Sequence, residues 1–88
     1  MHEYQIMLRG FLREQIRGHR KRRGMTQETM AEELRISPRS YAYLEKGTYG
    51  CSAATLMFYL LILSDEEVLQ LRMEFRVLVG KGGPYVVA

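Results

Sequence analysis

Four residues near the middle of the chain have the types and spacing needed to contact the edges of DNA bases. They are Pro38, Arg39, Ser40 and Tyr43, which lie at or beside the first, second and sixth positions of a short predicted helix. Arg39 can donate two hydrogen bonds to guanine O6 and N7. Ser40 can bond to either partner of a base pair, and Tyr43 can donate to a base or lie against a thymine methyl group. If this helix enters a major groove, these side chains could read a base sequence.

Two short helices with a brief connection must hold these side chains outward. Thr26 offers an N-cap hydroxyl for a helix over residues 27–34. Ser37, followed by proline at the first helical position, begins a second helix over residues 38–46. Short helices joined by so few residues cross at a steep angle, which leaves the N-terminal half of the second one exposed. Residues 26–45 are therefore the predicted reading unit.

Three further helices are expected around this unit. Apolar residues at i, i+4 spacing predict an amphipathic first helix that runs to about Arg23 and ends at Gly24. Residues 53–63 are uncharged and apolar on nearly all sides, so we expect several neighbours to enclose this fourth helix. The segment is too short to span a bilayer. Ser64 and Glu67 form a capping box for the fifth helix.

The predicted fold is all-α, with five helices in one domain over residues 1–79 and a tail over residues 80–88. A chain of 88 residues has room for one domain, and an apolar fraction of 47% is that of a globular protein. Residues 53–79 should supply core and dimerisation helices. Glycine and proline in residues 80–84 should break regular structure, and the apolar residues 85–87 could form a short strand or stay irregular.

Positive charge is concentrated in the first helix. The net charge is only +3, yet residues 1–24 hold seven Lys or Arg against two Glu. The densest part of this cluster contains Arg17, Arg20, Lys21, Arg22 and Arg23. Such a cluster favours a polyanionic partner. For any one of these residues, an equally good interpretation is a solvated helix end whose cations complement the helix dipole.

The reading unit also carries a specific sequence pattern. The chain reads Gly24-Met25-Thr26-Gln27-Glu28-Thr29-Met30-Ala31, then Leu34, then Leu44-Glu45-Lys46-Gly47. Over residues 12–60 this resembles the phage-repressor and Cro-like helix-turn-helix family, also called Xre. The resemblance implies a lambda-repressor-like domain that binds double-stranded DNA with residues 38–46 in the major groove. It also implies transcriptional regulation, as by a repressor that occupies an operator.

The same resemblance implies roles for individual residues. Gln27, with Thr26 beside it, would contact a DNA phosphate from the start of the second helix. Arg20 and Glu45 would form a buried ion pair that ties the first helix to the end of the third. With Arg20 engaged in that way, the better candidates for further phosphate contacts are Arg23, Lys46, Thr48 and Tyr49.

Three positions depart from the family pattern. Arg35 stands at the turn position that usually holds glycine, so it would be strained if its φ were positive. Tyr41 occupies an inward position that usually holds Ile or Val. The loop over residues 48–52 lacks the usual basic residues and proline, which should lower phosphate affinity.

No group of residues indicates an enzyme, a cofactor or a metal site. No nucleophile and base stand out as a pair, and His2 and His19 lack partners at metal-ligand spacing, so we expect them at the surface or as caps. Cys51 cannot form an intramolecular disulfide, and its default role is that of a half-buried small residue. The lone cysteine and the lack of a signal-peptide pattern favour the cytoplasm.

The C-terminal half carries more apolar surface than a small domain easily hides. Residues 60–63 and the face of the fifth helix therefore predict a homodimer, which would place two reading helices about 34 Å apart on successive major grooves. A second hypothesis is a protein-interaction module on the same scaffold, such as an antitoxin or anti-repressor. RNA binding through the first helix is less favoured because the aromatic residues form no stacking platform.

Overall fold

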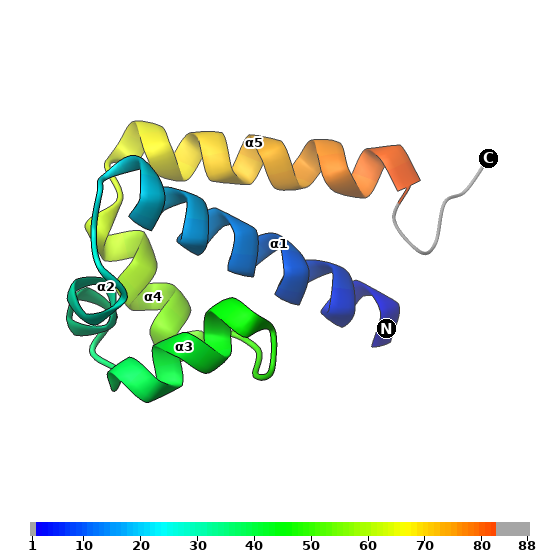
Figure 1. Cartoon of the computed structure of the whole chain (residues 1–88). Helices are drawn as coiled ribbons and strands as arrows, with labels where there is room; N and C mark the ends of the chain where they lie inside the picture. The colour runs from blue at the N-terminus through cyan, green and yellow to red at the C-terminus, as the bar shows by residue number, and fades with distance from the viewer. Residues whose placement is uncertain (1, 83–88) are drawn as a thin grey trace.

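The computed structural model describes residues 2–82, and the chain is all-α over that range, as predicted. Its helices are α1 (His2–Arg22), α2 (Gln27–Leu34), α3 (Pro38–Lys46), α4 (Ala53–Ile62) and α5 (Asp65–Gly82). The long helices α1 and α5 lie side by side in opposite directions, and the three short helices gather beside the C-terminal part of α1 (Figure 1). None of these helices is long and apolar enough to cross a membrane.

Side-chain caps begin the helices where the sequence predicts them. Thr26 Oγ1 accepts a hydrogen bond from Thr29 N at 3.0 Å, which caps α2. Ser37 caps α3 in the same way, with Pro38 in the first turn. Ser64 and Glu67 bond reciprocally through their side chains and backbone N–H groups, at 2.9 and 3.1 Å. The predicted capping box is thus confirmed, and these caps satisfy backbone donors that have no partner within the helix.

The fifth helix is longer than predicted. It continues through Gly80 and Lys81 to Gly82, where the glycines and Pro84 predicted a break. Glycine inside a helix costs only about 1 kcal/mol relative to alanine, and a lysine in the last turn favours the helix dipole, so the helix tolerates these residues. The two predictions for residues 85–87, a short strand or an irregular segment, concern residues outside the described range.

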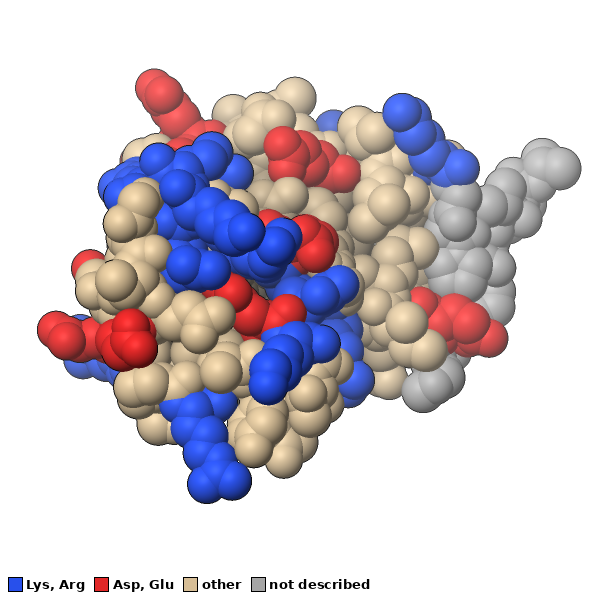
Figure 2. Space-filling view, in the orientation of Figure 1, with Lys and Arg blue, Asp and Glu red and all other residues tan. Residues whose placement is uncertain are grey.

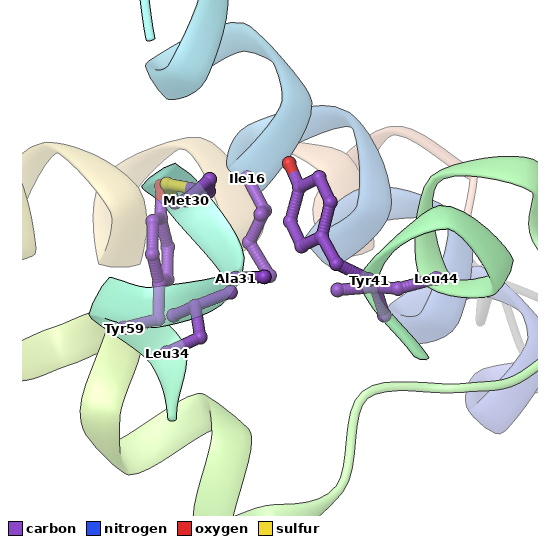
Figure 3. Packing of buried hydrophobic residues seen from close by; sticks show 7 residues of the cluster. All are labelled: Ile16, Met30, Ala31, Leu34, Tyr41, Leu44 and Tyr59. Carbon is purple, nitrogen blue, oxygen red and sulfur yellow. The ribbon is translucent and has the colours of Figure 1, made fainter. Parts of the chain in front are cut away.

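The core forms around α2, which packs on α3 on one side and on α4 on the other. Its buried cluster takes residues from the first four helices (Figure 3): Ile16, Met30, Ala31, Leu34, Tyr41, Leu44 and Tyr59. Ile16 reaches this cluster from α1 and is fully buried. All the apolar side chains of α2 are therefore inside the core, and α3 is fixed against them.

The prediction that neighbours enclose α4 is wrong for one of its faces. Thr55 and Tyr59 are buried, but Met57 and Leu61 are 60% and 74% exposed. These two residues lie at i, i+4 spacing on the side of α4 away from Tyr59. A domain of this size has too few elements to cover every face of a fully apolar helix.

Contacts between α1 and α5 follow one side of each helix. The Phe11 and Phe75 rings lie 5.2 Å apart between centroids, and Gln15 Nε2 donates to Glu74 at 2.6 Å. Near the other end, Arg23 lies 3.4 Å from Glu67. The start of α1 and the end of α5 extend past the three short helices (Figure 1).

Candidate nucleic-acid interface

The first turn of α3 is open to solvent. Pro38, Arg39 and Ser40 are exposed, while Tyr41 and Leu44 of the same helix are buried. This division follows from the helix period, which places Tyr41 and Leu44 on one face and Arg39 on another. The structure therefore places three of the four predicted base-reading residues outward at the N-terminal end of α3.

The fourth, Tyr43, is partly covered and joins a small aromatic cluster. Arg39 Nε donates to the Tyr43 hydroxyl at 3.3 Å, and its guanidinium lies 5.7 Å from the centre of the Tyr43 ring. The Tyr49 ring, 60% exposed, packs edge-on against Tyr43 with centroids 5.3 Å apart. Stacking of this kind limits the rotamers of the arginine. The fold thus brings Arg39 and Tyr43 together with Tyr49, which the sequence analysis expected at a phosphate.

The Glu45 carboxylate joins α1, α2 and α3. Arg20 donates to it from Nε at 2.6 Å and from Nη2 at 3.0 Å, and Gln27 Nε2 donates at 3.0 Å. The Tyr41 hydroxyl donates to the same carboxylate. The Glu45 and Arg20 side chains are only 8% and 15% exposed. This Glu45 hub links each helix of the α2–α3 unit to α1 through charge-assisted hydrogen bonds.

Electrostatics keeps the hub in one protonation state. Burial alone would raise the pKa of Glu45, but hydrogen bonds from Arg20, Tyr41 and Gln27 outweigh it and hold that pKa below its ordinary value. Burial and the neighbouring carboxylate raise the pKa of Tyr41, so its hydroxyl stays a donor. Arg20 also has a raised pKa because of its bond to Glu45. At neutral pH the hub is an ion pair with two neutral donors.

The hub changes the expected role of Gln27. Because its amide nitrogen donates to Glu45, the half-buried Gln27 side chain supports α3. The Oγ1 atom of Thr26 is likewise occupied as the cap of α2. Tyr41 was not predicted as a hub member, although Tyr41 and Glu45 have the i, i+4 spacing of neighbours on one helix face.

Three helices end in the same hydrogen-bonded motif. A residue one or two positions after each helix takes a left-handed conformation: Gly24 (φ 64°) after α1, Arg35 (φ 62°) after α2 and Gly47 (φ 80°) after α3. After α2, Arg35 N donates to Glu32 O and Ile36 N donates to Ala31 O, the pattern of a Schellman motif. Arg35 is thus in the strained conformation foreseen for this turn. Its guanidinium lies 4.9 Å from the Phe58 ring centre, an attraction that offsets part of the strain.

The remaining phosphate candidates fall into two groups. Lys46, Thr48 and Tyr49 are exposed at the end of α3 and in the loop after it. Arg23 follows α1, just before the start of α2, and it pairs with Glu67 of α5. Basic side chains also gather over α1 on the face shown in Figure 2.

One histidine differs from the prediction. His19, expected at the surface or as a cap, is 2% exposed and packs edge-on against Tyr59. Its Nδ1 atom has no hydrogen-bond partner within residues 2–82 and lies 4.0 Å from Glu67. Burial, with the nearby Arg23 charge, lowers the pKa of His19. The histidine is buried because it lies one turn beyond Ile16 on the inward face of α1.

The other chemically reactive groups form no site. Cys51 is half-buried, as expected, and burial raises the pKa of its thiol. A thiol in that state is a poor nucleophile at neutral pH. Within residues 2–82, no three His, Cys, Asp or Glu side chains are grouped to hold a metal ion.

An exposed polar helix start, held at a fixed angle by a short turn and a buried core, is the arrangement of a DNA-binding helix-turn-helix protein. A family model described as a helix-turn-helix domain matches residues 14–72. The chain therefore belongs to this helix-turn-helix family, whose members bind DNA. No curated protein and no solved structure matches the chain.

Proposed function

We propose that this protein is a sequence-specific transcriptional regulator of the phage-repressor and Cro-like (Xre) kind, which acts by occupying an operator. The observation that carries the proposal is the exposed first turn of α3, with Arg39 and Ser40 outward, on a helix fixed by the Glu45 hub. A rigid helix with polar residues at its start is what major-groove reading requires. Such a regulator would act beside the DNA in the cytoplasm.

In this proposal α3 lies in the major groove. Arg39 exchanges its bond to Tyr43 for guanine O6 and N7, while Ser40 bonds to a neighbouring base. Pro38 and the Tyr43 ring supply apolar contacts to thymine methyl groups. The Tyr43 ring, against which Tyr49 packs, restricts the Arg39 side chain before binding, so less side-chain entropy is lost on contact with DNA.

Phosphates flank α3 on two sides in this arrangement. Thr26 and Gln27 offer backbone N–H groups at the start of α2, with Arg23 near them in the chain. On the other side, three exposed residues face the backbone: Lys46, Thr48 and Tyr49. These contacts set the register of α3 and carry no sequence information by themselves.

Selection of bound duplexes from a random pool, followed by gel-shift titration, tests the proposal. Arg39→Ala should relax base preference by about 1–3 kcal/mol at one position and leave the fold intact. The matched variant Lys46→Ala should weaken binding to all duplexes equally. If the wild-type protein binds no duplex even at low salt, the proposal is wrong, and a protein-interaction module becomes the better hypothesis.

We also propose that two copies pair through α5. Leu69, Met73 and Val77 are 53%, 48% and 51% exposed, and their i, i+4, i+8 spacing aligns them on the side of α5 away from α1. We call these three residues the α5 stripe. Three large apolar side chains in one row on an exposed helix face are typical of a helix–helix interface.

The charges beside the α5 stripe favour a second copy of the chain as its partner. By the helix period, Arg72 and Arg76 border the stripe on one side. Glu74 lies on the other side, where its carboxylate also accepts hydrogen bonds from Gln15 of α1 and from Gln70. In a parallel pair about a two-fold axis, the arginines of each helix face the side of the partner helix that carries Glu74 and not its arginines. An antiparallel pair would bring the arginines together, so we infer the parallel arrangement.

A further inference from the structure

Three arginines form a row on α1 that the proposed reading unit does not use. Arg9, Arg13 and Arg17 follow at i, i+4, i+8 spacing, and we call them the arginine ridge. Phe11 and Gln15, which contact α5, lie on the opposite side of α1 by the helix period. The ridge therefore points away from α5.

Contacts place the ridge over the end of α3. Arg13 Nη1 donates to the backbone oxygen of Glu45 at 3.3 Å. The Cδ atom of Arg13 would lie only 3.5 Å from a Cβ atom built on Gly47, and Arg9 Nε only 3.0 Å from one built on Gly50. The two side chains thus cover the backbone of the loop that holds the exposed Thr48 and Tyr49. Because these two residues are proposed phosphate contacts, the ridge continues the same surface.

We propose that the arginine ridge binds DNA phosphates and extends the backbone contact from the loop after α3 along α1. The inference rests on the proposed DNA-binding function. Arg9 and Arg13 both precede residue 14, where the helix-turn-helix family match begins. Arg17 lies within the matched residues, so the ridge begins before the matched segment and continues into it.

The length of the ridge and the weakness of its ion pairs suit a phosphate row. Residues 9–17 of a helix span about 12 Å, with about 6 Å between successive arginines. One DNA strand rises about 3.4 Å per nucleotide, so about three phosphates fall within that length. Glu14 lies 3.4 Å from Arg13 and 3.7 Å from Arg17, but these side chains are exposed enough that the pairs are weak. The guanidinium groups can exchange Glu14 for phosphate at little cost.

The test is the salt dependence of binding to a mixed-sequence duplex. The variant Arg9→Gln/Arg13→Gln should lower the slope of log K against log salt by about 2, because each lost phosphate contact removes about 0.9. The matched control is Arg22→Gln/Lys81→Gln, which removes the same charge from the far side of α1 and the end of α5. Its slope should stay at the wild-type value.

A third variant separates charge from structure. Arg9→Lys/Arg13→Lys keeps both cations but not the guanidinium geometry, so its slope should equal that of the wild-type protein. Thermal unfolding of each variant shows whether the fold is intact. If the double variant unfolds at a lower temperature than the wild-type protein, the single variant Arg9→Gln replaces it in the test. Equal slopes for the ridge variant and the control overturn this inference and leave the proposed function standing. If the wild-type protein binds no duplex, both fall.

Discussion

The α2–α3 unit and the pair of long helices, α1 and α5, achieve their stability in different ways. Within the α2–α3 unit, Met30, Ala31 and Leu34 are fully buried, and a carboxylate that accepts four hydrogen bonds fixes the end of α3. Along the long helices, side chains of the same apolar kind stay about half exposed, as at Ile6 and Val77. The α2–α3 unit buries its apolar side chains within the chain, whereas α1 and α5 leave apolar side chains exposed on a surface suited to a partner.

A small domain divides its side chains between those that fix its structure and those that stay exposed for a partner. A reading helix must keep one angle to the DNA, and directional bonds to a buried charge define an angle better than apolar contact does. Helices that bind a second copy or a phosphate row need exposed stripes, which lower the stability of the isolated chain. The following substitutions test this division, in order of decreasing effect.

Removal of the hub carboxylate should have the largest effect. Glu45→Ala leaves Arg20 buried without its counter-ion and should lower the free energy of unfolding by about 3–5 kcal/mol. Urea denaturation measures the change. Glu32→Ala, at an exposed carboxylate of α2, is the control and should stay within about 0.5 kcal/mol. An equal effect of the two substitutions would mean that the hub does not stabilise the unit.

Disruption of the α5 stripe should separate the proposed dimer without unfolding the chain. Met73→Asp places a charge in the centre of the stripe, and an unpaired charge is costly at a helix–helix interface. Sedimentation equilibrium should then show a monomer, while Ile6→Asp, at an equally exposed apolar residue of α1, should leave the dimer intact. A wild-type protein that is monomeric at micromolar concentrations would contradict the pairing.

Relief of backbone strain at Arg35, in the turn after α2, should raise the stability of the protein. Arg35→Gly and Arg35→Ala both remove the contact with Phe58, so their difference isolates the left-handed backbone at φ 62°. Because glycine adopts this conformation without strain, the glycine variant should be more stable than the alanine variant by about 1 kcal/mol. Thermal unfolding compares the two, and a more stable alanine variant would count against strain at this turn.

His19 should give the smallest change, confined to mildly acidic pH. Its pKa in the folded chain is below the ordinary 6.5, so the unfolded chain binds more protons in that window. The free energy of unfolding should therefore fall as pH drops below about 6.5, by less than about 1.4 kcal/mol per pH unit for one group.

His19→Leu should flatten this part of the pH profile. The loss of stability at lower pH should remain, because Glu45 and Glu67 have pKa values below their ordinary 4.5 and must be protonated there. Denaturation at a series of pH values measures both parts. An unchanged profile in the variant would show that His19 takes up no proton on unfolding.

The sequence by itself determined the local features of this protein. Capping residues such as Ser37 and Ser64 begin helices, and glycines such as Gly24 and Gly47 end them, because these effects act over one helical turn. The period of the α-helix also predicted which face of α3 is exposed. The bounds of α2 and α3 and the position of the reading unit follow from such short-range bonds.

Only the tertiary structure decided which helices meet. It brought Gln27 and Tyr41 to the same carboxylate as Arg20, buried His19 against Tyr59, and placed Arg13 over the end of α3. These contacts join residues far apart in the chain, or depend on a neighbour that covers one face of a helix. Their signal in the sequence is weak, because the types of residue involved serve equally well on a solvated surface.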